Sequence, residues 1–407
     1  MRARWLGLAA VVALAPVLSG CGGAGVSGAS EAAGSQLSIY SSLPLQGPAA
    51  AISQQISNGE KLALAQAGGR AGAYKIGYVS LDDSNPNRGR WDPGVTATDA
   101  KTAAQDTSTI AYLGDYNSAA TAVSLPLINA AGILQVTPGS PYVGLTSPLD
   151  AGQDEPERFY PTGRRTFGRL QPGDSVEAAA QVALMRDLGV SRLYVLDDQD
   201  PFDVPLAAIV AGEAKRVGIS VAAHDSIATS AGAIYTGELK KITKSHAQAV
   251  FFAGAPGPGA SALWRQLHTA DPHLLLLGSS SMVDESFTAQ IGAAGANTYL
   301  TTPVLAPQLY PASGQRVLNQ YRRAFGAEAG AYALYGYEAM SVVLDAIRSA
   351  GARGNDRQVV IARFFATRVR DSVIGRYSMQ ADGETTLARY GVDRVVNGRP
   401  VFYRAIP

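Results

Sequence analysis

Short apolar segments of strand length alternate with amphipathic stretches of helix length along most of this chain. The strand-like segments are residues 37–40, 74–80, 110–113, 133–136, 192–196, 219–223, 249–252, 274–277 and 299–301. Helical spacing of apolar residues separates them, as in the stretch 50–67. Strands that are apolar on both faces need a cover on both sides, so the pattern predicts an α/β protein with parallel sheets between layers of helices.

Residues 110–146 are the most informative unit for function. A strand ends at a turn with Gly114, a helix opens near Asn117 and Ser118, and the next strand ends in a loop that contains Gly139 and Ser140. Ligands of open parallel sheets bind outside the carboxyl ends of the strands. A helix N-terminus there presents free N–H groups that suit a carboxylate. Capping and turn formation would explain the same residue types without any ligand.

The N-terminus reads as a targeting segment. Arg2 and Arg4 precede an apolar run, and the segment finishes with LSGC at Cys21. This ending resembles the bacterial lipobox, which implies a signal peptide at 1–20, cleavage before Cys21 and a lipid on its thiol; a plain signal peptide is the alternative. Residues 21–36 are small and polar, so we expect a flexible tether and a lipid-anchored protein on the extracytoplasmic face of the cell membrane.

Net charge and motif content argue against several function classes. A net charge of +1 gives no reason to expect nucleic acid as a partner. The four histidines show no metal-ligand spacing, and the glycine-rich run 253–259 lacks the Lys-Ser/Thr of a phosphate-binding loop. We therefore predict no enzyme activity, no metal and no cofactor.

Several motifs in a fixed order resemble one known family. They are SSLPLQGP (41–48), the pair Asp82–Asp83, YLGDYNSAATAVSLPLINAAGILQVTP (112–138), VLDDQDPFDVPLA (195–207), ALYGYEAMSVVLDAI (333–347) and VIGRYSMQADGE (373–384). Together they resemble the leucine/isoleucine/valine-type substrate-binding proteins of ABC importers.

The resemblance implies the type I periplasmic-binding-protein fold, an α/β fold with two Rossmann-like lobes. Each lobe has a parallel central sheet, and three crossings form the hinge. On this mapping, lobe 1 is residues 37–168 and 302–372, and lobe 2 is residues 169–301 and 373–407. Such lobes close over a ligand.

The resemblance also implies a set of ligand-binding residues. They are Asn117, Ser118, Gly139 and Ser140 from lobe 1, Phe202 and Ser280 from lobe 2, and the aromatic pair Tyr332 and Tyr335. For the two tyrosines, packing in a helix core is an equal alternative. The family's acidic residue for an α-ammonium group falls on or near Ser280, and a family aromatic falls on Ala255. These departures put branched-chain amino acids in doubt and admit amides and organic acids as ligands.

The expected function is therefore that of an extracytoplasmic solute-binding lipoprotein of an ABC importer. Its expected partners are a small molecule (an amino acid, an amide or an organic acid), the subunits of an ABC permease, and the membrane through the lipid anchor. A sensory lipoprotein of the same fold, which reports ligand occupancy without transport, is the alternative.

Overall fold

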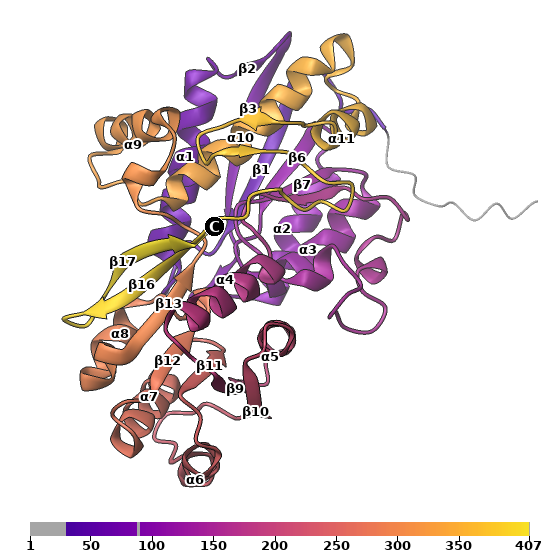
Figure 1. Cartoon of the computed structure of the whole chain (residues 1–407). Helices are drawn as coiled ribbons and strands as arrows, with labels where there is room; N and C mark the ends of the chain where they lie inside the picture. The colour runs from indigo at the N-terminus through magenta and orange to yellow at the C-terminus, as the bar shows by residue number, and fades with distance from the viewer. Residues whose placement is uncertain (1–29, 88–89, 407) are drawn as a thin grey trace, which may run out of the picture.

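The structure is a computed structural model that describes residues 30–87 and 90–406. Two sheets form the centres of two lobes (Figure 1). The first sheet contains, in spatial order, β2 (Arg70–Ala71), β3 (Tyr74–Asp82), β1 (Gln36–Leu43), β6 (Thr109–Gly114), β7 (Leu134–Thr137) and β8 (Phe167–Arg169). All neighbours in it are parallel except β2 and β3. The carboxyl ends of its main strands consequently lie at one edge.

The second sheet combines a parallel part with an antiparallel hairpin. Its order is β10 (Ser220–Ser226), β9 (Arg192–Asp197), β11 (Ala249–Ala253), β12 (Leu275–Gly278), β13 (Thr298–Thr302), β16 (Tyr390–Val396) and β17 (Arg399–Ile406). The strands from β10 to β13 are parallel, and β16 and β17 form the hairpin at the edge. Asn397 and Gly398 make its two-residue turn, and both have positive φ, as a type I′ hairpin turn requires.

Helices cover both faces of each sheet. The first sheet carries α1 (Ala50–Gln66), α2 (Pro93–Gln105), α3 (Ser118–Ala130), α9 (Ala312–Phe325), α10 (Tyr332–Ser349) and α11 (Arg357–Phe365). The second sheet carries α4 (Asp174–Asp187), α5 (Val204–Arg216), α6 (Thr236–Ser245), α7 (Pro258–Ala270) and α8 (Glu285–Gln290). The predicted layering of helices around parallel sheets is therefore present.

Helices α1 and α10 pack so closely that each needs a glycine at the contact. A Cβ atom on Gly59 would lie 2.1 Å from the carbonyl oxygen of Ala333. A Cβ atom on Gly336 would lie 2.1 Å from the carbonyl oxygen of Ile56. Any side chain at either position would push the two helices apart, so these glycines fix how α10 lies on the first lobe.

The chain crosses between the two sheets after β8, after β13 and before β16. Residues 373–387 were expected in lobe 2. Instead, Val373, Ile374, Tyr377 and Met379 are buried in the core of the first lobe. The last crossing therefore lies just before Tyr390, which begins the hairpin of the second sheet.

The expected tether overlaps with folded structure. Ala32 is 1% exposed and belongs to the first core. Its N–H donates to the carbonyl oxygen of Asn355 at 2.7 Å, and the N–H of Arg357 donates to the carbonyl oxygen of Ser30 at 2.8 Å. Residues 30–36 are thus part of the first lobe, because their backbone groups pair with α11 and the segment before it. The signal peptide and Cys21 lie outside the described residues.

Among the described residues, no helix combines the length and the apolar character that a membrane crossing requires.

Candidate functional site

A cavity of about 570 Å³ lies between the two lobes. Its wall includes six of the eight residues that the resemblance implied: Asn117, Ser118, Ser140, Phe202, Ser280 and Tyr332. Residues from both sheets meet here because the carboxyl ends of β6 and β7 face the carboxyl ends of β9, β11 and β12 across the gap. A small molecule in this cavity would touch both lobes at once.

The start of α3 forms the first-lobe wall. Asn117 occupies the position before the helix, and its side chain makes no capping hydrogen bond. The Ser118 hydroxyl accepts a hydrogen bond from the N–H of Tyr142 at 3.2 Å. The N–H groups of the first helical turn therefore keep no side-chain cap and face the region where an anionic group would be stabilised.

Ser140 lines the cavity, but its hydroxyl is already engaged. The residue is fully buried and adopts φ of 55°. Its Oγ lies 2.6 Å from Thr121 Oγ1 and donates to the carbonyl oxygen of Asp115 at 2.9 Å. Ser140 therefore holds the loop after β7 against the start of α3.

Two of the predicted residues lie outside the cavity wall. A Cβ atom on Gly139 would come within 2.6 Å of the carbonyl oxygen of Tyr116, so Gly139 permits the close approach of two loops. Tyr335 is 4% exposed, and its hydroxyl donates to the carbonyl oxygen of Pro303 at 2.8 Å. Of the two readings for Tyr335, packing in the helix core is the one that this structure shows.

Aromatic rings form part of both walls. Tyr332 meets Tyr116 edge-on, with ring centroids 5.9 Å apart. Phe202 follows β9 and packs edge-on against Tyr142 at 4.9 Å. Trp91, which lies in the short strand β5 (Arg90–Trp91), also lines the cavity. These rings provide an apolar surface for the body of a ligand.

Three carboxylates in the second-lobe wall were not anticipated: Asp174, Glu177 and Asp203. Asp174 and Glu177 lie on the first turn of α4, and Asp203 immediately precedes α5. Burial raises the pKa of both Asp174 and Asp203 well above the ordinary range, and neighbouring carboxylates raise it further. In sequence they look like ordinary acidic residues at helix starts, which gave no separate signal.

Glu177 is buried and binds Ser280 through both of its oxygens. The N–H of Ser280 donates to Oε1 at 2.6 Å, and the Ser280 hydroxyl donates to Oε2 at 2.7 Å. Thr301 and Tyr390 donate to the same carboxylate at 2.6 and 2.9 Å. Ser280 thus lines the cavity while its own hydrogen-bonding groups turn toward Glu177.

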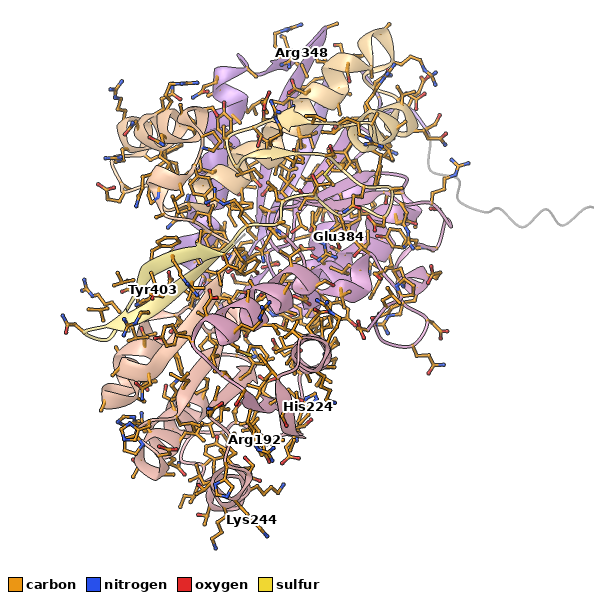
Figure 2. All side chains as sticks on the ribbon, viewed as in Figure 1. Arg192, His224, Lys244, Arg348, Glu384 and Tyr403 are labelled. Atoms are coloured by element: carbon orange, nitrogen blue, oxygen red, sulfur yellow. The ribbon has the colours of Figure 1, made fainter. Side chains whose placement is uncertain are left out.

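Arg169 links the loops at the hinge. It is fully buried at the end of β8 and donates to the carbonyl oxygens of Ser140 and Tyr142 at 2.5 and 2.8 Å. Its Nε lies 3.0 Å from a carboxylate oxygen of Glu384, which Figure 2 shows between the two lobes. This ion pair ties the crossing after β8 to the crossing before β16.

Among residues 30–87 and 90–406, no group of three or more His, Cys, Asp or Glu side chains is arranged to hold a metal ion.

Known proteins share this arrangement of two lobes with a cavity between them. A model of the family described as "Periplasmic binding protein" matches residues 41–399. The chain belongs to the periplasmic binding protein family. This membership, together with the relatives and solved structures described next, confirms the predicted type I fold and the resemblance to the leucine/isoleucine/valine type.

This periplasmic binding protein is also similar to individual proteins of known type. It is 24% identical over 396 residues to Leu/Ile/Val-binding protein homolog 3 of Brucella melitensis biotype 1, covering 95% of this chain and 98% of the relative. It superposes on a leucine-binding protein from Thermotoga maritima with a TM-score of 0.73 and 21% identity, covering 91% and 98% of the two chains. It also superposes on a solute-binding protein from R. palustris in complex with benzoate, with a TM-score of 0.70, 16% identity and coverage of 91% and 96%.

Proposed function

We propose that this protein is an extracytoplasmic solute-binding lipoprotein that closes two lobes over a small polar molecule and delivers it to an ABC permease. The observation that carries the proposal is the cavity, whose wall combines the N-terminus of α3 in one lobe with carboxylates and Phe202 in the other. Such a wall can hold a ligand only while the lobes face each other, which couples binding to closure.

The relatives support the same function. One is named a Leu/Ile/Val-binding protein homolog, and a structural neighbour from Rhodospirillum rubrum is described as a putative branched-chain amino acid ABC transporter. The LSGC segment that ends at Cys21 supports anchoring by a lipid on that thiol. The proposal involves no chemical change of the ligand.

Binding and closure can be tested on the purified chain. A thermal-shift screen of amino acids, amides, amines and organic acids should identify compounds that raise the melting temperature, because a ligand that binds only the native state stabilises it. A hit should also reduce the radius of gyration in small-angle scattering. A hit that the protein turns over into a product would contradict the proposal.

Transport and anchoring need tests in the source cell. Deletion of the gene should abolish high-affinity uptake of the radiolabelled hit, and a plasmid copy should restore it. A Cys21→Ser copy should appear in the soluble extracytoplasmic fraction. If the purified protein binds the hit but uptake is unchanged in the deletion strain, the protein is a ligand-binding receptor and its proposed role in import is wrong.

A further inference from the structure

The charges on the cavity wall are strongly unequal. Five carboxylates line the cavity: those of Asp174, Glu177, Asp200, Asp203 and Asp284. Arg90 is the one Lys or Arg among the lining residues that the structure describes, and it is exposed. Such a cleft lowers the electrostatic potential inside it and concentrates cations.

Three of these carboxylates already have protein partners. Glu177 accepts four hydrogen bonds from Ser280, Thr301 and Tyr390. Asp284 accepts from the N–H of Phe287 at 2.7 Å and thereby caps α8. Asp200 accepts from the N–H of Phe202 at 2.9 Å, which shapes the loop after β9. These acids have structural roles that need no ligand.

Asp174 and Asp203 are different. Asp174 is 3% exposed, and its Oδ2 accepts a single long hydrogen bond of 3.3 Å from the N–H of Val143. Within the described chain, neither Asp174 Oδ1 nor either oxygen of Asp203 accepts a hydrogen bond from the protein. Asp203 is half-buried. A carboxylate oxygen that loses its contact with water when the cleft is filled is unfavourable unless a donor reaches it.

Helix capping does not account for these two residues. Asp203 occupies the position before α5 without making a capping hydrogen bond, and Asp174 is the first residue of α4, where Gly173 occupies the position before the helix. The two helix N-termini reduce the cost of the negative charges. Nearby Arg169 is directed elsewhere, to Ser140, Tyr142 and Glu384.

Asn117, on the opposite wall, is a third residue with an unpaired side-chain acceptor. Its Oδ1 atom is buried and has no hydrogen-bond partner within the described residues. Both lobes therefore place side-chain acceptors without a protein donor in the cavity wall. The rings of Tyr116, Tyr332 and Phe202 also line the cavity, and aromatic ring faces attract cations.

We infer that the cleft selects small molecules with a net positive charge, whose ammonium groups bind Asp174 and Asp203. An ammonium group beside each of these carboxyl groups would lower the pKa that burial raises and would favour the ionised form. A diamine or an amino acid with a cationic side chain can place an ammonium group beside both, whereas a neutral amino acid has only one. An anionic group of such an amino acid would lie at the N-terminus of α3. The inference rests on the proposed function, because it concerns the ligand of the same cavity.

The sharpest test compares probes that differ by one charge. L-lysine and L-norleucine share the α-amino acid group and a four-carbon chain, and only lysine has the terminal ammonium. In titration calorimetry we expect lysine or 1,5-diaminopentane to bind at least tenfold more tightly than norleucine, and hexanoate to bind most weakly. Norleucine or hexanoate binding as tightly as both cations would overturn the inference.

Variants assign the effect to the two carboxylates. Asp203→Asn keeps the shape and should weaken binding of the tighter cation at least tenfold, and it should weaken binding of norleucine, which has one ammonium group, by a smaller factor. Glu328→Gln removes one negative charge from an exposed residue of the first lobe and should leave both affinities unchanged. The circular dichroism spectrum verifies folding, and Asp174→Asn gives a second, independent substitution. Equal affinity of wild type, D203N and D174N for the cation would also overturn the inference.

The outcomes separate the two levels of the proposal. If the thermal-shift screen yields only neutral or anionic hits, the solute-binding function stands and the inferred selectivity for positively charged ligands is wrong. If lysine, diaminopentane and every compound of the screen leave both the melting temperature and the scattering profile unchanged, the solute-binding function is wrong as well.

Discussion

Ser280 donates two hydrogen bonds to Glu177, from its N–H to Oε1 at 2.6 Å and from its hydroxyl to Oε2 at 2.7 Å. The pair joins the loop after β12 to the first turn of α4, at the wall of the cavity. Ser280 occupies the region where the family resemblance placed an acidic residue, and here it is the partner of an acid that comes from another element. The negative charge in this part of the cleft is thus supplied by α4.

Replacing Glu177 should destabilise the second lobe. Glu177→Gln keeps the size of the side chain, but its amide nitrogen would face donors that now bind Oε1 or Oε2, leaving buried groups unpaired. We expect the free energy of unfolding to fall by about 2–4 kcal/mol, measured by urea denaturation. Glu238→Gln on α6, a partly exposed acid, should stay within about 0.5 kcal/mol of wild type. Equal midpoints for E177Q and wild type would contradict this assignment.

Two adjacent aspartates should respond to pH in opposite directions. Asp83 is fully buried, and neither of its oxygens has a hydrogen-bond partner within the described residues. Burial, and then the charges of Asp115 and Asp99, raise the pKa of Asp83 to about 8. Between pH 4 and 8 the native state therefore holds a proton that the unfolded chain has released, and stability falls as the pH rises. Asp83→Asn should raise the free energy of unfolding at pH 8 by at least about 1 kcal/mol, with little change near pH 4.

Asp82 provides the matched control. Burial opposes ionisation, but hydrogen bonds from Gln46, Ser84 and Leu45 prevail and lower the pKa of Asp82. Its contribution to stability is present above the unfolded pKa and is lost as the pH falls through the folded pKa. Asp82→Asn should therefore destabilise at pH 7, where Asp83→Asn stabilises. Thermal unfolding across pH 4–8 would disprove the assignment if both variants shifted the same way.

Phe202 and Tyr335 should separate binding from stability. Phe202→Ala removes a ring from the cavity wall and should weaken the best hit of the ligand screen by about tenfold or more. Tyr335→Phe removes the hydroxyl that donates to Pro303 and leaves the ring in place, so we expect unchanged affinity and a loss of about 0.5–1.5 kcal/mol in stability. Calorimetric titration and urea denaturation of both variants provide the measurements. A loss of affinity in Y335F would return Tyr335 to the binding site.

The segment before β1 should contribute to stability. A chain beginning at Leu37 loses the buried side chain of Ala32 and the backbone bonds of residues 30–33. We expect its melting temperature to be a few degrees below that of a chain beginning at Ser30. Ala32→Asp should have a similar effect, while Ala33→Asp, at the exposed neighbouring position, should not. Equal melting temperatures for the two chains would show that the segment packs without stabilising.

The sequence predicted the two-lobed fold well because strand and helix periodicities alternate over hundreds of residues. The last crossing was placed too early because the apolar residues between Val373 and Met379 show that they are buried, but not in which core. Tyr332 and Tyr335 could not be distinguished for a related reason. They lie three residues apart on α10, near the same face, and only packing directs one ring to the cavity and the other to Pro303.

The motifs located much of the cavity wall because they mark strand ends, where ligands of this fold bind. Asp174, Glu177 and Asp203 escaped notice because an acid at a helix start is favourable on its own. Whether such an acid is capped, bonded or left facing a cavity depends on partners from distant elements, such as Tyr390 for Glu177.

Backbone hydrogen bonds attach residues 30–33 to Asn355, Arg357 and Thr107. This segment is therefore the part of the folded protein on which a pull on the N-terminus would act. These contacts lie at the amino end of β1, and the cavity lies beyond its carboxyl end, about 25 Å away for eight residues of strand. A protein held through its N-terminus is therefore suspended by the far end of the first lobe. The cavity therefore lies at the opposite end of β1 from the attached segment, so an anchor at the N-terminus would hold the first lobe by the end that carries no part of the cavity wall.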